Sequence, residues 1–123
     1  MVSNNKNILQ DKSYQFSLEI VKLCKYLQED KREKILSNQV LRSGTAIGAL
    51  LCEAEFAQSL SDFINKLSIS LKEANETRYW IKLLRDSGYI EQVKAVEYLD
   101  QINQLISMLV SSINTSKIKL KSK

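Results

Sequence analysis

The chain has 123 residues, of which 44% are hydrophobic and 26% charged, a composition typical of one globular domain rather than of a disordered segment. No histidine occurs and no apolar run approaches the roughly 20 residues of a membrane span, so the usual catalytic triads and a spanning helix are excluded. The formal net charge is +4, and without the four lysines of the last seven residues the basic and acidic residues balance.

Residues 1–12 lack the apolar core of a secretory signal, so we expect a cytoplasmic protein whose folded domain follows this N-terminal extension. The two cysteines, Cys24 and Cys52, have no metal-binding spacing between them. We interpret them as small buried hydrophobic residues on helices of a protein in a reducing cytoplasm.

A helix is predicted from about residue 13, where Ser13 can serve as its N-cap. Hydrophobic residues then repeat at intervals of four, three and four, which places on one face Phe16, Ile20, Leu23 and Leu27. The charged run 29–34 interrupts this pattern, and we interpret it as an exposed connection, with a solvated helical turn as the alternative.

The next helix is predicted over 34–57. Its expected core stripe, with Ser43 in the intervening place, consists of Leu36, Val40, Ile47, Leu50, Ala54 and Ala57. Gly44 and Gly48 lie one turn apart inside it, where glycine costs about 1 kcal/mol relative to alanine. Close approach of another backbone would offset this cost, so we expect tight packing there. A phosphate-binding loop is excluded, since no strand precedes these glycines and no GK[ST] follows.

A further helix is predicted to start near residue 60, with Ser59 or Ser61 as its N-cap, and to end before Gly88, which suits a left-handed C-cap. Its expected core residues are Leu60, Phe63, Ile64, Leu67, Leu71, Ala74, Ile81 and Leu84. The last helix follows Ile90, and its apolar residues in three-four alternation are Val96, Leu99, Ile102, Ile106, Leu109 and Ile113.

These patterns predict an all-α protein. Short connections between four helices of comparable length favour an antiparallel up-down-up-down four-helix bundle over residues 13–115. Residues 116–123 then form a basic C-terminal tail with Lys117, Lys119, Lys121 and Lys123. Such a tail can attract polyanions without sequence preference, and it is also typical of a solvated chain end.

A second apolar stripe is predicted behind the core face of the helix over 60–86. At 100° per residue, Ile69, Trp80 and Leu83 project about 160–220° away from Leu67, where a monomeric bundle would place charges. Tryptophan is a favoured anchor of protein interfaces. We therefore expect this face to contact a second subunit; the alternative is that a loop or a chain end of the same subunit covers it.

A basic ridge is predicted on the last turns of that helix, where Arg78, Lys82 and Arg85 follow at intervals of four and three. A carboxylate from a neighbouring helix could neutralise it, a nucleic-acid backbone could bind it, or it could simply suit the helix dipole. The acidic residues Glu53, Glu55, Glu73 and Glu76 form the best carboxylate cluster, which we interpret as solvated or salt-bridged. We expect no metal, no cofactor and no enzymatic activity.

The segments LRSGTAIGALLCEA, AQSLSDFINKLSISLKEANETRYWIKLL and RDSGYI resemble the four-helix bundle proteins encoded in intervening sequences of large-subunit ribosomal RNA genes. The same family includes the accessory variability proteins of diversity-generating retroelements, and the resemblance covers about residues 16–109. It implies a non-enzymatic homopentamer, which in the retroelement branch binds nucleic acid and a reverse transcriptase. It also implies that the phosphate or partner contacts are Arg42, Arg78, Lys82 and Arg85. Leu50 stands where relatives read asparagine, which favours the intervening-sequence branch.

Two functions remain open at this point. The favoured one is an oligomeric, accessory RNA- or DNA-binding protein that uses the basic ridge and the lysine tail. The alternative is a self-assembling scaffold that binds only protein partners, such as a reverse transcriptase. Neither function involves a membrane.

Overall fold

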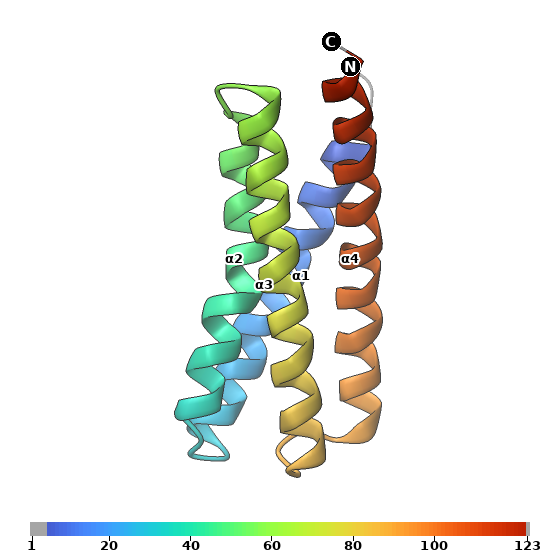
Figure 1. Cartoon of the computed structure of the whole chain (residues 1–123). Helices are drawn as coiled ribbons and strands as arrows, with labels where there is room; N and C mark the ends of the chain where they lie inside the picture. The colour runs from blue at the N-terminus through green and yellow to red at the C-terminus, as the bar shows by residue number, and fades with distance from the viewer. Residues whose placement is uncertain (1–4, 123) are drawn as a thin grey trace.

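The computed structural model describes residues 5–122, which fold into four α-helices without a strand. The helices are α1 (Asn5–Glu29), α2 (Ile35–Glu55), α3 (Leu60–Asp86) and α4 (Gln92–Lys121). Successive helices run in opposite directions and pack side by side, and α4 returns beside α1 (Figure 1). The predicted all-α, up-down-up-down four-helix bundle is confirmed. None of the four described helices is long and apolar enough to cross a membrane.

Helix α1 begins at Asn5, well before the predicted start at Ser13. Ser13 is therefore not an N-cap: it is buried inside the helix, where its hydroxyl donates to the Gln10 carbonyl at 2.8 Å. The earlier start buries Leu9 in the core and makes residues 5–12 helical. The N-cap prediction was wrong because a serine hydroxyl can bond to the backbone of the preceding turn as readily as to the first amides of a helix.

The charged run 30–34 connects α1 and α2, as predicted. Arg32 takes a left-handed backbone conformation there, with φ of 55°. The Glu33 carboxylate then accepts hydrogen bonds from three backbone N–H groups at the start of α2, at 2.8 to 3.1 Å. At the start of α3, Ser59 is the N-cap, since its Oγ accepts from the Asp62 N–H at 3.0 Å.

Gly88 ends α3 as the sequence predicts. Its φ is +86°, a conformation that side chains with a Cβ rarely adopt. Its N–H donates to the Arg85 carbonyl at 3.1 Å, and the Tyr89 N–H donates to the Leu84 carbonyl at 2.9 Å. This pair of bonds is a Schellman motif, which satisfies two of the free carbonyls at the helix end.

The two glycines of α2 bring this helix against α1. A Cβ added to Gly44 would lie 3.0 Å from two carbons of the Ile20 side chain. A Cβ added to Gly48 would lie 3.2 Å from the Ser13 hydroxyl oxygen. The predicted close approach at these positions is therefore confirmed, and α1 is the partner helix.

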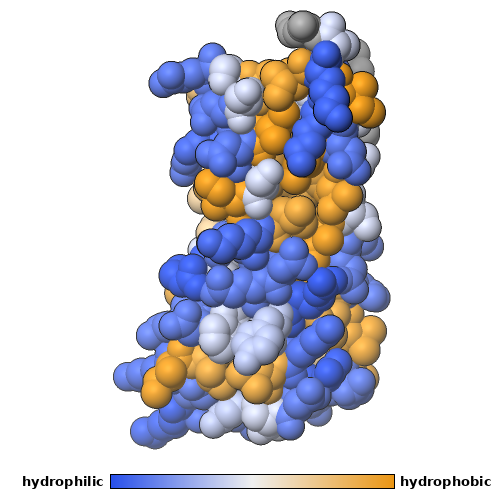
Figure 2. All heavy atoms as spheres, viewed as in Figure 1, coloured by the Kyte–Doolittle hydropathy of each residue, from blue (hydrophilic) through white to orange (hydrophobic). Residues whose placement is uncertain are grey.

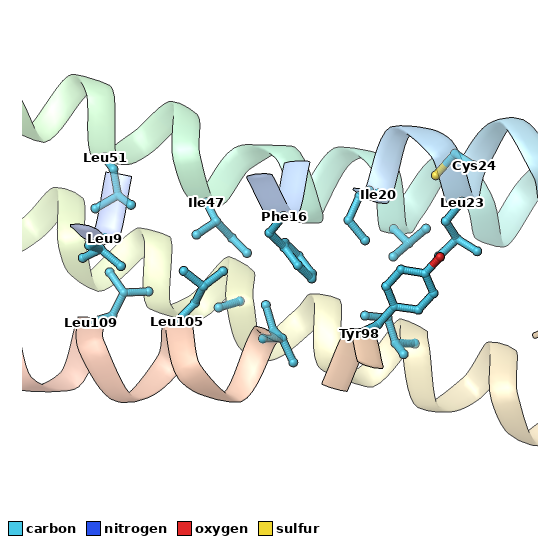
Figure 3. Packing of buried hydrophobic residues seen from close by; sticks show 14 of the residues in the cluster. Leu9, Phe16, Ile20, Leu23, Cys24, Ile47, Leu51, Tyr98, Leu105 and Leu109 are labelled. Carbon is cyan, nitrogen blue, oxygen red and sulfur yellow. The ribbon is translucent and has the colours of Figure 1, made fainter. Parts of the chain in front are cut away.

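One hydrophobic core runs along the bundle and receives side chains from all four helices (Figure 3). The sequence placed Leu50 of α2 in the core, but its neighbour Leu51 is buried there instead and Leu50 is only half-buried. In α4 the predicted Ile102, Leu109 and Ile113 are buried, but the core also contains Ala95, Tyr98 and Leu105, and the predicted Val96 is exposed. The largest fully buried side chains are Phe16, Ile20, Leu27, Val40, Ile47, Leu67, Thr77, Ile81, Leu84, Ile102, Leu105 and Leu109.

Buried hydroxyl groups connect neighbouring helices within this core. Thr77 of α3 lies 2.8 Å from the Ser43 hydroxyl of α2. About two turns earlier on α3, the Ser70 hydroxyl donates to the Ile47 carbonyl at 3.0 Å. Within residues 8–122 every buried polar side-chain atom has a hydrogen-bond partner. The Thr77 hydroxyl also lies 2.8 Å from the Glu73 carbonyl of its own helix. These bonds link α2 to α3 inside the core without leaving a polar group unpaired.

Candidate nucleic-acid interface

Arg42 of α2 is held by carboxylates of α3. Its guanidinium forms ion pairs with Glu76 and, at 3.4 Å, with Glu73. It also donates to the Gln39 side chain at 3.4 Å. The sequence prediction of a phosphate contact did not include these partners, because Glu73 and Glu76 lie more than thirty residues away along the chain. A phosphate at Arg42 would have to compete with both carboxylates.

Trp80 lies beside the same cluster. Its indole Nε1 donates to the Glu76 carboxylate at 3.2 Å, and its ring meets Tyr79 edge-on with 5.1 Å between the ring centres. The ring is half-buried and packs against the core of its own chain. Ile69 and Leu83 are also half-buried. These residues therefore lie at the flank of the core rather than fully behind it, and their role as an interface stays a prediction.

The basic ridge is largely bonded to side chains of the same molecule. Arg78 donates to Asn75 at 2.8 Å and to Asn103 of α4 at 3.0 Å. Arg85 donates twice to the neighbouring Asp86, at 2.8 and 3.3 Å. This bond lowers the pKa of the Asp86 carboxyl, and Lys82 nearby lowers it further. Lys82 itself is exposed.

The four residues assigned by resemblance do not share one surface. Arg42 lies where α2 meets α3, whereas Arg78 reaches across to Asn103 of α4. The predicted lysine tail is farther away still: α4 rises about 1.5 Å per residue, so Lys117 lies about 21 Å along the helix from Asn103. A single phosphate backbone cannot contact all these groups on one molecule without following its length.

The lysine tail is the helical end of α4. Ile113 and Ser116 are the last buried residues of this helix, and the turns that follow are exposed. Lys117, Lys119 and Lys121 have no carboxylate partner among the described residues, and Lys123 lies outside them. Ile118, 69% exposed, lies between two of these lysines. Apart from the exposed Lys82, the end of α4 is thus the part of the predicted site whose charges have no partner among the described residues.

The carboxylate cluster considered for metal binding is paired. Glu53 forms an ion pair with Lys66 at 3.1 Å, and Glu55 accepts from Gln10 at 2.9 Å. Glu73 and Glu76 bind Arg42. Within the described part of the chain, no group of three or more cysteines, aspartates or glutamates is arranged to hold a metal ion. The salt-bridged interpretation of these residues is confirmed for Glu53, Glu73 and Glu76.

On the face seen in Figure 2, apolar atoms reach the surface between the polar side chains in the upper half and again near the lower end. The exposed large hydrophobic residues include several on α1 and α4 that the sequence did not single out: Tyr14, Leu18, Tyr26, Val93, Val110 and Ile118. Sequence periodicity identified the one apolar stripe of α3 and not these, because single apolar residues outside a core stripe are common.

Comparison with known proteins identifies the family. The family model of the 23S rRNA-intervening sequence protein matches residues 5–111. A crystal structure from Bacteroides thetaiotaomicron, of a protein with unknown function from the S23 ribosomal protein family, is 45% identical with a TM-score of 0.89. That match covers 90% of this chain and 99% of the other. No curated protein matches. Because the family model matches most of its length, this chain belongs to the family of 23S rRNA-intervening sequence proteins.

Proposed function

We propose that this protein is a non-catalytic, self-assembling bundle that binds RNA through the exposed end of α4. The observation that carries the proposal is the contrast between its cations. Arg42, Arg78 and Arg85 already bind side chains of their own molecule, whereas the lysines at 117, 119 and 121 have no partner within residues 5–122. Unpaired lysines attract a phosphate backbone by charge and carry no base preference.

The last turns of α4 lie beyond residue 111, where the match to the family model ends. The charge that supports binding is therefore carried on a helical extension of the family core. RNA is the favoured nucleic acid because the name of the family refers to intervening sequences of 23S ribosomal RNA. Self-assembly would place several lysine ends on one particle, so that weak contacts of single ends add up to a considerable affinity.

A salt titration tests RNA binding. A fluorescein-labelled RNA single strand is titrated with the protein between about 50 and 200 mM salt, and fluorescence anisotropy gives the affinity. The variant Lys117→Gln/Lys119→Gln/Lys121→Gln is compared with the wild type. If each lysine neutralises one phosphate, the slope of log affinity against log salt falls by about 2 per protomer for a single strand.

The matched control is Lys25→Gln/Lys34→Gln/Lys72→Gln, which removes the same charge from exposed positions away from the end of α4. This control should keep the wild-type slope. An equal loss in both triple variants would mean that only net charge matters, and the assignment to α4 would be withdrawn. A wild-type protein that binds no RNA at the lowest salt would contradict the proposal altogether.

A protein scaffold is the second candidate, and the half-buried Ile69, Trp80 and Leu83 favour it. An indole that is partly exposed beside isoleucine and leucine offers the aromatic anchor that protein interfaces use. Under this alternative the protein still assembles, but neither RNA nor DNA binds at low salt. The titration above therefore separates the two functions.

A further inference from the structure

A cleft of about 330 Å³ opens between α1 and α4, at the end of the bundle where α1 finishes and α4 begins. Its volume falls at the lower end of the range of small-ligand sites. It lies away from the lysine end of α4 and from the Arg42 cluster. The residues that line it are Glu19, Lys22, Leu23, Tyr26, Ile90, Glu91, Lys94 and Tyr98.

The cleft exists because this half of α1 is bonded to α2 rather than to α4. The Cys24 thiol donates to the Ser37 carbonyl at 3.3 Å, and the Gln28 amide donates to the Ser37 hydroxyl at 3.0 Å. Within the described residues, the one hydrogen bond between α1 and α4 joins Lys12 to Gln104, near the opposite end. In Figure 1, α1 lies near α4 at the chain ends and near α2 at the other end.

The inner wall of the cleft is apolar and aromatic. Leu23, Ile90 and Tyr98 are buried, and the ring of Tyr98 points toward α1 at Leu23 (Figure 3). Tyr26 is 41% exposed at the edge. Among the described residues the Tyr98 hydroxyl has no hydrogen-bond partner and no buried polar atom lacks one, so this hydroxyl reaches the open cleft. Burial raises the pKa of Tyr98, so the hydroxyl stays neutral and can donate a hydrogen bond.

The rim carries balanced charges. Glu19 pairs with Lys22 at 3.6 Å, and Lys94 pairs with Glu97 at 3.4 Å while its ammonium lies 5.4 Å from the centre of the Tyr98 ring. Glu91 has no ion-pair partner among the described residues and can accept hydrogen bonds. Two carboxylates and two ammonium groups line the cleft, so neither a free anion nor a free cation is favoured there. A flat, neutral ring with polar edges fits this lining better.

We propose that the cleft binds one unpaired nucleobase of an RNA strand, with the base stacked against Tyr26 and its edge bonded to Tyr98 and Glu91. Aromatic side chains stack on unpaired bases in this way, and a glutamate accepts from the amino group of a base. Lys31, 6.0 Å from the centre of the Tyr26 ring and without a carboxylate partner among the described residues, suits an adjoining phosphate. This inference rests on the proposed RNA binding and adds to it a preference for single strands over duplexes.

The test compares a labelled single-stranded RNA with the corresponding duplex. The variant Tyr26→Ala should bind the single strand roughly tenfold more weakly, while its salt slope and its affinity for the duplex stay at wild-type values. Tyr26→Phe keeps the ring and should bind like the wild type. The matched control is Tyr14→Ala, which removes a tyrosine that is 63% exposed on the same helix and does not line the cleft. Circular dichroism confirms that each variant is folded.

Unchanged single-strand binding by Tyr26→Ala, or an equal loss toward single strand and duplex, would overturn the cleft proposal. A second measurement distinguishes a cleft that binds no base from a protein that binds no RNA strand. Guanosine and cytidine, which carry no phosphate, are titrated while the tyrosine ring signals are followed by NMR. Shifts at Tyr26 and Tyr98 with none at Tyr14 support the cleft even if the wild type binds no RNA strand. No shift at Tyr26 or Tyr98 overturns it.

Discussion

Cys24 shows how burial changes the chemistry of a single side chain. It is buried where α1 meets α2, and burial, assisted by the nearby Glu33 carboxylate, raises the pKa of its thiol from 9.0 to about 11. Cys52 is exposed, so its predicted burial was wrong: the buried face of α2 contains its neighbours Leu51 and Ala54 instead. Since the thiolate is the reactive form, Cys24 should be inert in the folded protein. Its titration instead affects stability.

The first prediction is a loss of stability at alkaline pH. Between pH 9 and pH 11 the unfolded chain loses the Cys24 proton while the folded chain keeps it, so the free energy of unfolding falls as pH rises. Over that window the fall is about 2 kcal/mol from this group. Urea unfolding of the wild type and of Cys24→Ala at pH 8 and pH 10.5 measures it. The variant should lose less stability between the two pH values; an equal loss would contradict the assigned pKa.

A second prediction concerns Gly44 and Ile20. Gly44→Ala gains about 1 kcal/mol of helix propensity but forces the new Cβ against the Ile20 side chain, and overpacking of this kind costs about 1–3 kcal/mol. We expect the variant to be less stable by about 1 kcal/mol in urea unfolding. In an Ile20→Ala background the obstacle is gone, and Gly44→Ala should become stabilising. The same sign in both backgrounds would show that the contact does not decide the effect.

At the scale of the element, the start of α2 depends on a residue outside the helix. Lys34 occupies the N-cap position and makes no side-chain capping bond. Glu33 supplies it instead, with its carboxylate on the N–H groups of Ile35, Leu36 and Ser37. A negative charge at this end also suits the helix dipole. The loop and the helix are thus held together by one side chain.

The third prediction follows from this cap. Glu33→Ala should lower the free energy of unfolding by about 1–2 kcal/mol, because three backbone donors lose their acceptor. Glu33→Gln should lose less, since its amide oxygen can still accept. The control is Glu29→Ala, an exposed change at the end of α1 that should stay within about 0.5 kcal/mol of the wild type. Similar losses in Glu33→Ala and Glu29→Ala by thermal unfolding would refute the capping role.

At the scale of the whole molecule, the distribution of charge separates a nearly neutral body from a basic end. Two arginines of the body, Arg42 and Arg78, bond to side chains of α3 and α4. At the end of α4, three lysines without a carboxylate partner among the described residues follow the last buried residue, Ser116. The three lysines of one α4 end would bind RNA weakly. Assembly of several subunits would raise the affinity, because several such ends then contact the same strand.

The fourth prediction is therefore the mass of the particle in solution. Light scattering after size-exclusion chromatography should give a multiple of the 14.1 kDa chain mass. Leu83→Glu places a charge on the apolar flank of α3 and should lower that mass. Val93→Glu, a change at a residue 70% exposed at the start of α4, should not. A wild-type mass of 14.1 kDa would refute assembly.

Much of the fold could be predicted because it depends on local rules. The repeat of Phe16, Ile20, Leu23 and Leu27, the cap at Ser59 and the left-handed Gly88 each act within a few residues, and each is confirmed. The start of α1 was missed since Leu9 is buried by packing with other helices. The buried face of α4 was predicted one residue too far along the chain. Two apolar faces of this helix share Ile102, Leu109 and Ile113, and only packing against the other helices decides which face is buried.

The sequence by itself determined the number of helices, their order and most of their inward faces, because helix periodicity and end signals are properties of short segments. Only the tertiary structure decided which charges remain available and where a cleft opens. The partners of Arg42 and Arg78 come from other helices, and the cleft results from α1 bonding to α2 rather than to α4. Such pairings join residues far apart in the chain, and no local pattern records them.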